Sequence, residues 1–151
     1  MIIADINVLL PALRPELPDH QASWNWLERT ATNRVGLGVA DVSIAGLVRI
    51  STNRRAFADP VPVEEALGFV DDLIESGVTI VHAGPGHWRF MREILAKTKA
   101  TGDLVSDAHL AAIAIENGAR IATRDRDFMR FAGVDWFDPL ETEARPAPGR
   151  G

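Results

Sequence analysis

The sequence predicts a single α/β domain in which helices cover both faces of a parallel sheet. Short apolar runs alternate along the chain with longer segments whose apolar residues recur at helical spacing, and this alternation is typical of parallel sheets. The 151 residues suit one compact domain. A content of 46% hydrophobic and 25% charged residues excludes a disordered or fibrous chain.

The expected elements follow one another along most of the chain. Buried strands are predicted at residues 2–4, 35–39, 78–81, 119–122 and 134–137. Helices are predicted over residues 20–32, 42–53, 63–76, 87–99 and 107–117. Residues 141–151 combine proline, glycine and charges without an apolar period. We therefore expect a domain over residues 1–140 and a flexible tail over 141–151.

Composition restricts the function and the compartment. Sixteen Lys and Arg residues against 21 Asp and Glu residues give a net charge of −5, which argues against binding nucleic acid through bulk positive charge. A local basic track near an acidic site stays possible. The chain has no cysteine, which excludes a thiolate nucleophile and Cys-bound zinc. No apolar stretch is long enough to span a bilayer, and the first residues lack the pattern of a signal peptide, so we expect a cytoplasmic protein.

Two carboxylates stand where a core is expected. Asp5 ends the apolar run 2–4 and precedes another apolar stretch. Burying such a charge is costly unless a cation or several donors compensate it, although capping of a helix by Asp5 or Asn7 is an equal alternative. Steps of three and four residues from Asp107 reach only apolar positions, so its carboxylate shares the inward stripe of an Ala-rich helix. Interaction with the helix dipole is the alternative there, and Ser106 is available as the cap.

A third carboxylate, Asp125, follows the predicted strand 119–122, in the same kind of position as Asp5. Asp127 follows it, and the run 124–127 (RDRD) could also be a solvated, self-paired charge cluster. Ligands in open parallel sheets bind beyond the carboxyl ends of the strands, where these acids are expected to meet. Carboxylates held close together repel unless a divalent cation neutralises them, and hard oxygen ligands suit Mg²⁺ or Mn²⁺. We infer a metal-dependent nuclease site.

The chain resembles PIN domains, and among them the ribonuclease toxins of VapBC toxin–antitoxin pairs, over residues 2 to about 140. The motifs are residues 3–9 (IADINVL), 107–112 (DAHLAA) and 122–128 (ATRDRDF). The resemblance implies a PIN-like three-layer sandwich, with a short parallel sheet flanked by helices. It also implies Mg²⁺-dependent (or Mn²⁺-dependent) endoribonuclease activity, a homodimer and a cognate VapB-type antitoxin.

The resemblance also assigns roles to residues. Asp5, Asp107 and Asp125 stand at the metal-binding and catalytic positions. Asn7 and Thr123 stand at the polar positions that orient those carboxylates, and Asp127 is expected to hold a second metal or fix the loop.

One position departs from the family pattern. Gly46 stands where most of these toxins carry a glutamate. The site then has three acids rather than four, and we expect one well-defined metal, with a second bound only alongside RNA. Asp41 or Asp103 could contribute instead, but their spacing does not match the motif.

Local positive charge near the site comes from arginines. Arg49, Arg54, Arg55 and Arg124 are candidates for binding RNA phosphates, because guanidinium groups bind phosphate through two hydrogen bonds. A solvated helix end is the alternative for the first three.

The sequence leaves one other function open and argues against a second. Gly46 favours a catalytically weakened PIN-like module that acts through a protein partner. A receiver domain would need adjacent acids after the first strand and a lysine at a strand end, and neither is present.

Overall fold

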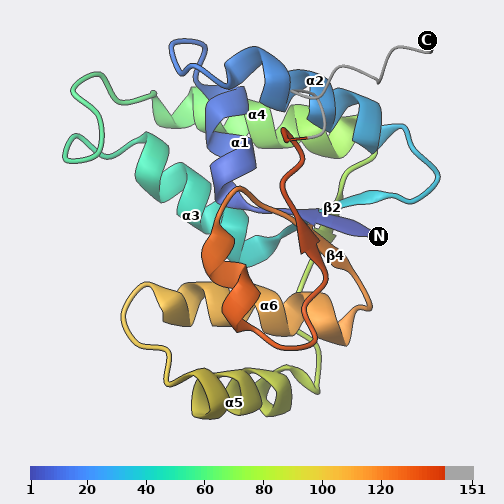
Figure 1. The fold of residues 1–151 in the computed structure, drawn as a ribbon. Helices are drawn as coiled ribbons and strands as arrows, with labels where there is room; N and C mark the ends of the chain where they lie inside the picture. Colours follow the sequence, from blue (N-terminus) through green and yellow to red (C-terminus); the bar gives the residue numbers. More distant parts are fainter. Residues whose placement is uncertain (142–151) are drawn as a thin grey trace, which may run out of the picture.

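The structure is a computed structural model, and it describes residues 1–141. Figure 1 shows helices on both sides of a small central sheet. In chain order the elements are β1 (Ile2–Ala4), α1 (Ile6–Leu13), α2 (His20–Ala31), β2 (Leu37–Ala40), α3 (Asp41–Ser51), α4 (Val63–Glu75), β3 (Thr79–Val81), α5 (His87–Thr98), α6 (Leu104–Glu116), β4 (Arg120–Ala122), η1 (Arg126–Arg130, a 3₁₀ helix) and β5 (Trp136–Phe137). The predicted tail, apart from Glu141, lies outside the described residues.

The sheet is parallel throughout and has β1 at its centre. The strand order is β3-β2-β1-β4-β5, and Ala4 pairs with Val39 on one side and with Ala122 on the other. The chain builds β2 and β3 on one side of β1 before it crosses to build β4 and β5 on the other side. In such sheets the point where the strand order reverses opens a crevice at the carboxyl ends of the strands. Here that crevice lies beyond β1 and its neighbours.

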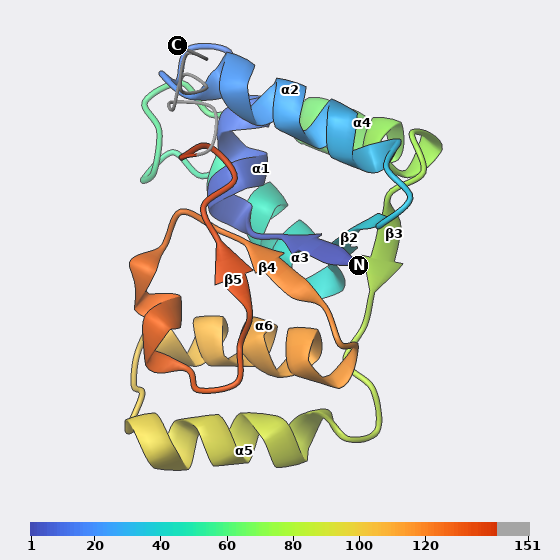
Figure 2. The same cartoon turned by 45° about the vertical axis from the view of Figure 1, so that its right-hand side comes forward.

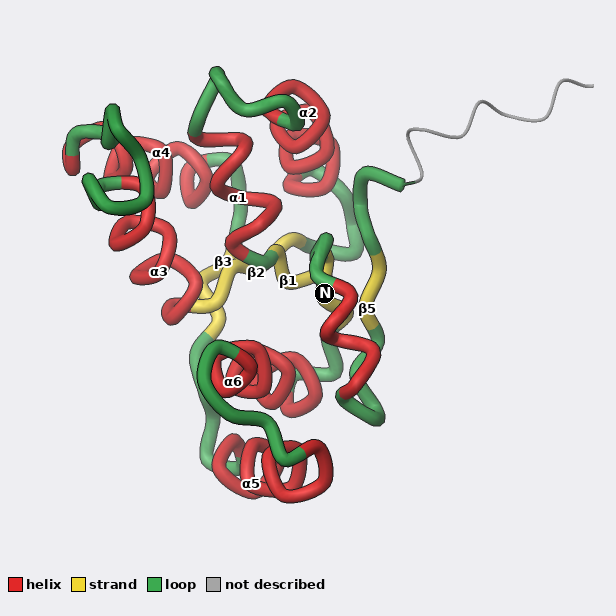
Figure 3. The backbone as a smooth tube through the Cα atoms, turned by 60° about the vertical axis from the view of Figure 1, so that its left-hand side comes forward, coloured by secondary structure: helices red, strands yellow, loops and turns green. Residues whose placement is uncertain are grey.

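Successive side chains of each strand point to opposite faces of the sheet, so the core is divided into two parts. Ala4, Val39 and Ala122 pack with α1 to α4, whereas Ile3 and Ile121 pack with α5 and α6. Figures 2 and 3 show the resulting layers, with α6 next to the sheet and α5 outside it. The alanines of α6 are fully or almost fully buried, so the helix approaches the sheet closely. The predicted three-layer parallel α/β fold is confirmed. No helix within residues 1–141 has the length and apolar character needed to cross a membrane.

Several boundaries differ from the predicted ones, among them the starts of β2 and α6. The predicted strand 35–39 begins only at Leu37, because Asn33 and Gly36 close a turn in which Gly36 has a φ of 80°. Helix α6 begins at Leu104 rather than at 107. Ser106 therefore lies inside the first turn, and the prediction that it caps the helix is wrong. Asp103 occupies the cap position, without a side-chain hydrogen bond to the helix.

Helix α1 has no counterpart among the predicted helices. Its sequence, INVLLPAL, is apolar almost throughout and contains Pro11, so it lacks the amphipathic period by which helices are recognised. The structure buries four of its residues between the sheet and the neighbouring helices. Asp5 caps its first turn, which ties the start of α1 to the end of β1.

Two glycines test the packing around the sheet. A methyl group at Gly38 in β2 would lie 2.7 Å from Cγ2 of Val81 and 3.0 Å from Sδ of Met1. We expect Gly38→Ala to lower the free energy of unfolding by about 1–3 kcal/mol, because a packed core resists added volume. Gly68, inside α4, has no atom within 4 Å of the same position. Gly68→Ala is the matched control, and it should raise stability by about 0.5–1 kcal/mol. Urea unfolding measures the free energy of unfolding of both variants. Equal changes in the two variants would contradict the close packing at Gly38.

Candidate functional site

Asp5 lies at the carboxyl end of β1 and is buried. Its Oδ1 accepts a hydrogen bond from the Ile6 N–H at 2.7 Å, so the capping interpretation is correct for this oxygen. Its Oδ2 accepts hydrogen bonds from Thr123 Oγ1 at 2.7 Å and Asn7 Nδ2 at 2.9 Å. Burial raises the pKa of the Asp5 carboxyl, and the nearby negative charge of Asp125 adds to this rise. Neutral donors therefore hold the Asp5 carboxylate, and no cation of residues 1–141 pairs with it.

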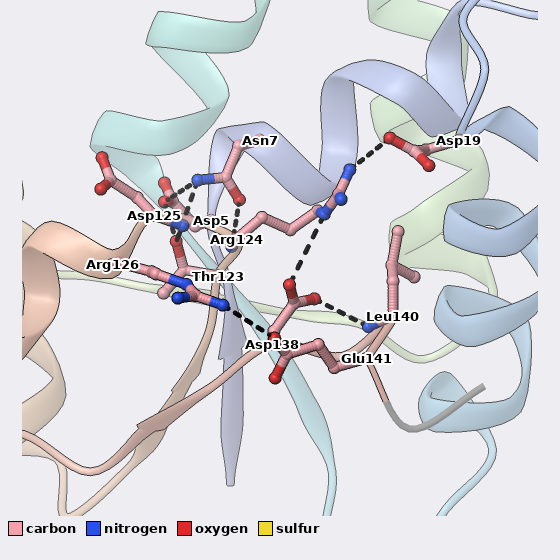
Figure 4. A network of polar contacts seen from close by, with 10 residues as sticks. All are labelled: Asp5, Asn7, Asp19, Thr123, Arg124, Asp125, Arg126, Asp138, Leu140 and Glu141. Atoms are coloured by element: carbon pink, nitrogen blue, oxygen red, sulfur yellow. Dashed lines mark hydrogen bonds and ion pairs between the residues drawn. The ribbon is translucent and has the colours of Figure 1, made fainter. Parts of the chain in front are cut away.

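Thr123 and Asn7 join the ends of β1 and β4, as Figure 4 shows. Asn7 Nδ2 donates to Thr123 Oγ1 at 2.9 Å, and Asn7 Oδ1 accepts from the Arg124 N–H at 3.0 Å. Thr123 is fully buried, and its Oγ1 also accepts from the Asp125 N–H at 3.0 Å. Both residues thus form hydrogen bonds that hold the Asp5 carboxylate, and Thr123 also holds the backbone of Asp125.

Asp125 ends the stretch that leaves β4, and it caps η1. Its Oδ1 accepts a hydrogen bond from the Asp127 N–H at 2.8 Å. The alternative of a self-paired charge run is wrong for this segment. Arg124 pairs with Asp19 and lies 3.7 Å from Asp138, and Arg126 pairs with Glu141. Asp127 lies 3.1 Å from Arg130 Nε. Within residues 1–141, Asp125 itself has no cationic partner.

Asp107 lies in the first turn of α6 and is partly exposed. Its carboxylate accepts no hydrogen bond from any described residue. Desolvation raises its pKa from the ordinary value of 3.8 to about 6, and the negative charges of Asp5, Asp125, Asp127 and Asp103 contribute to this rise. The three predicted acids are therefore close enough to repel one another.

A hollow of about 330 Å³ opens beside these carboxylates. It is lined by Asp5, Ile6, Val42, Ser43, Ala45, Gly46, Arg49, Ser106, Asp107 and Leu110. Asp125 and Asp127 contribute charge but do not line it. Sequence reasoning missed Ser106 as a lining residue because the start of α6 was placed three residues too late.

The acids fit a hard divalent cation, although they do not form a closed cage. Within residues 1–141, no three His, Cys, Asp or Glu side chains are placed to hold one ion together. Mg²⁺ does not require such a cage, because it keeps several waters and is usually bound through one or two carboxylates and substrate phosphates. The unpaired carboxylate of Asp107 and its raised pKa show a negative potential that the described residues leave uncompensated.

The helix α3 supplies no acid to the hollow. A Cβ atom at Gly46 would lie 2.5 Å from Cδ1 of Ile6, so the Ile6 side chain fills the space beside the helix. Of the two substitute acids, Asp41 is engaged elsewhere: its Oδ2 lies 2.9 Å from His82 Nδ1, an interaction that lowers the Asp41 pKa. Asp103 is near enough to raise the Asp107 pKa. Asp103 is therefore the better placed of the two.

The predicted RNA-binding arginines differ in their surroundings. Arg124 is held by Asp19 and Asp138, which gives its guanidinium a structural role. Arg49, Arg54 and Arg55 are exposed, and none of them forms an ion pair with a described residue. Of these three, only Arg49 lines the hollow.

Comparisons with known proteins identify the family of the chain. The family model of the PIN domain matches residues 2–134. Ribonuclease VapC43 of Mycobacterium tuberculosis is 37% identical over 142 residues, which cover 93% of this chain and 97% of that protein. The solved structure of VapBC2 from Rickettsia felis, bound to a DNA fragment from its promoter, matches with a TM-score of 0.68 and 18% identity, over 91% of this chain and 98% of that chain.

A second solved structure also shares the fold. VapC20 of Mycobacterium tuberculosis, a toxin that cleaves the sarcin–ricin loop, matches with a TM-score of 0.66 and 13% identity over 89% of this chain and 96% of that chain. At such identities the structures establish the fold, whereas the family model and the identity to VapC43 establish the relationship. The chain belongs to the PIN-domain family, and within it to the VapC ribonucleases.

Proposed function

We propose that this chain is the toxin of a type II toxin–antitoxin pair and that it hydrolyses RNA phosphodiester bonds as a metal-dependent endoribonuclease. One observation carries the proposal: Asp5, Asp107 and Asp125 gather at one edge of the sheet without a cation among the described residues to neutralise them. Repelling carboxylates cost stability, so their presence favours a role that the fold alone does not explain. Membership of the VapC family supports the same conclusion.

The chain's own residues have separable tasks in this reaction. Mg²⁺ or Mn²⁺, held by Asp5, Asp107 and Asp125, would activate a water and stabilise the negative charge that develops at phosphorus. Asn7 and Thr123 fix the Asp5 carboxylate by hydrogen bonds. The backbone of Asp127 fixes the Asp125 carboxylate, while the Asp127 side chain is engaged with Arg130. No side chain forms a covalent intermediate with RNA in this scheme.

RNA, an antitoxin and a second copy of the chain are the proposed partners. Arg49, Arg54 and Arg55 form no ion pair within residues 1–141, and their guanidinium groups suit RNA phosphates. A small VapB-type antitoxin would inhibit the enzyme by placing a basic side chain among the carboxylates of the hollow. We propose a homodimer that acts in the cytoplasm, where its RNA substrate is found.

The alternative is a PIN-like binding module with little catalytic activity. The Ile6 side chain beside Gly46 favours this alternative, because it fills the place of a fourth acid. Calorimetry with Mn²⁺ separates the two functions. Binding of Mn²⁺ at millimolar concentration or below supports the enzyme, whereas its absence together with tight binding to a small partner protein supports the module.

Removal of any one of the three carboxylates should abolish RNA cleavage. We expect Asp5→Asn, Asp107→Asn and Asp125→Asn to lower the cleavage rate by on the order of 100-fold or more in Mn²⁺, because each removes a charged oxygen ligand. Asp71→Asn, an exposed position on α4, is the matched control. Gel analysis of a labelled RNA measures the rates. Cleavage by Asp5→Asn at the rate of the control would overturn the proposed site.

The burial of Asp107, together with the negative charges of its neighbours, should make stability depend on pH. The native state keeps a proton on this group up to about pH 6, whereas the unfolded chain releases it near the ordinary pKa of 3.8. The native state thus binds more protons in this interval, and stability falls as pH rises through it. We expect Asp107→Asn to raise the Tm by a few degrees at pH 7 without metal, since about 1 kcal/mol corresponds to about 2–4 °C in a domain of this size. The gain should vanish below pH 4.

Metal should reverse this order of stability. Mn²⁺ is expected to raise the Tm of the wild-type protein at pH 7 more than that of Asp107→Asn, because ligands stabilise the state that binds them. Calorimetric melting with EDTA and with Mn²⁺ measures both effects. A wild-type Tm that is equal to or above that of the variant in EDTA at pH 7 would contradict the raised pKa of Asp107.

Thr123 should matter through the carboxylates that it orients. Thr123→Val removes a buried hydroxyl that bonds Asp5, Asn7 and the Asp125 N–H, and we expect about 10–100-fold slower cleavage. Thr123→Ser keeps the hydroxyl and should restore most of the rate. Mn²⁺ affinity should follow the same order. Equal rates for the Val and Ser variants would show that the hydrogen bonds are not needed.

A further inference from the structure

The hollow beside the carboxylates has two unlike walls. The end of β1 and the first turn of α6 form an acidic wall with Asp5 and Asp107. The opposite wall comes from α3, whose lining residues are small or apolar apart from Ser43 and Arg49. Arg49 is the one cationic side chain among the residues that line the hollow. A single site thus presents negative charge on one side and a guanidinium group on the other.

Arg49 does not serve as a counter-ion for the acidic wall. No carboxylate of the described residues lies within ion-pair distance of its guanidinium, although Asp5 and Asp107 line the same hollow. The arginines of the β4–η1 segment differ, because Arg124, Arg126 and Arg130 are each paired with a carboxylate. A guanidinium that leaves nearby carboxylates unpaired keeps its donors available for another anion.

The surroundings of Arg49 favour an anion that enters from solvent. Arg49 lies in the last turn of α3 and is exposed to solvent. Gly46 lies three residues earlier on the same helix and lines the same hollow without a side chain that could compete for the guanidinium. Ile6 and Leu110 add apolar surface to the lining of the same hollow, and this surface offers no competing acceptor for the guanidinium.

From this geometry we infer that Arg49 binds a backbone phosphate adjacent to the one that is cut, so that the RNA strand crosses the hollow from the α3 wall to the acidic wall. The inference rests on the proposed ribonuclease function and adds the anchoring of the substrate to it. The guanidinium donates two hydrogen bonds to non-bridging phosphate oxygens. Because Arg49 stands apart from the carboxylates, it contributes to binding of the RNA and leaves the chemical step unchanged.

Binding of RNA without metal tests the anchor directly. A short fluorescein-labelled single-stranded RNA is titrated with the full chain in EDTA at several salt concentrations, and anisotropy reports the affinity. Arg49→Gln should weaken binding about tenfold and should reduce the slope of log K against log salt by about 0.7, the contribution of one phosphate contact to a single strand. Arg49→Lys should keep the slope and lose part of the affinity, because a lysine keeps the charge but cannot form the paired hydrogen bonds.

Arg34→Gln is the matched control. Arg34 is an exposed arginine without an ion pair in the described chain, and it lies before β2, at the opposite edge of the sheet from the hollow. In cleavage assays with Mn²⁺, Arg49→Gln should raise KM about tenfold and leave kcat within about twofold of wild type. Arg34→Gln should change neither constant.

The outcomes separate the anchor from the proposed function. Affinity, salt slope and KM of Arg49→Gln that equal those of Arg34→Gln would overturn the anchor, as would a loss confined to kcat. A wild-type chain that neither binds nor cleaves RNA would instead overturn the proposed function. Arg49 is exposed, so Arg49→Gln should unfold at the wild-type Tm, which shows that a loss of binding is not a loss of fold.

Discussion

The pairing of β1 with β4 is the constraint on which the site depends. The hydrogen bond between Thr123 and Asp5 joins residues 118 positions apart, and it exists because parallel neighbours end at the same edge of a sheet. Asn7, in the first turn of α1, closes the arrangement by bonding both residues. Six hydrogen bonds among this network and its neighbours then hold Asp5 and Asp125, with no cationic partner in the part of the chain that the structure describes. The backbone topology, rather than an ion pair, therefore brings the acids together.

Neutral donors at this point have an electrostatic consequence. An arginine in the place of Thr123 or Asn7 would stabilise Asp5 more strongly, but it would also cancel the negative potential of the hollow. Threonine and asparagine satisfy the carboxylate oxygens and leave the charge in place. Burial raises the pKa of Asp107 to about 6, and the negative charges of Asp5 and Asp125 add to this rise. A site that keeps this carboxylate gives up stability, and the proposed binding of a cation would recover it.

The sequence predicted the parts of the fold that follow local rules. Alternating apolar runs and periodic segments identify the strands and five helices, and the acids at strand ends point to one edge of the sheet. Helix α1 is not predicted because its sequence, INVLLPAL, has no polar face. Its burial on several sides depends on tertiary contacts that the sequence does not show. The start of α6 was misplaced because Asp103 occupies the cap position without a capping hydrogen bond, so no local signal marks it. Pairings such as Arg124 with Asp19 depend on tertiary structure alone.

The loss of the acid on α3 changes the character of the hollow rather than only reducing its charge. A glutamate at position 46 would place a negative charge three residues before Arg49, at the spacing where the two side chains can pair on the helix surface. Glycine removes that partner, and Ile6 fills the space with an apolar side chain. The guanidinium of Arg49 is then released from the competition of an acid on its own helix. The glycine that leaves fewer ligands for the proposed cation also leaves Arg49 without an acidic partner among the described residues, as the proposed binding of a backbone phosphate requires.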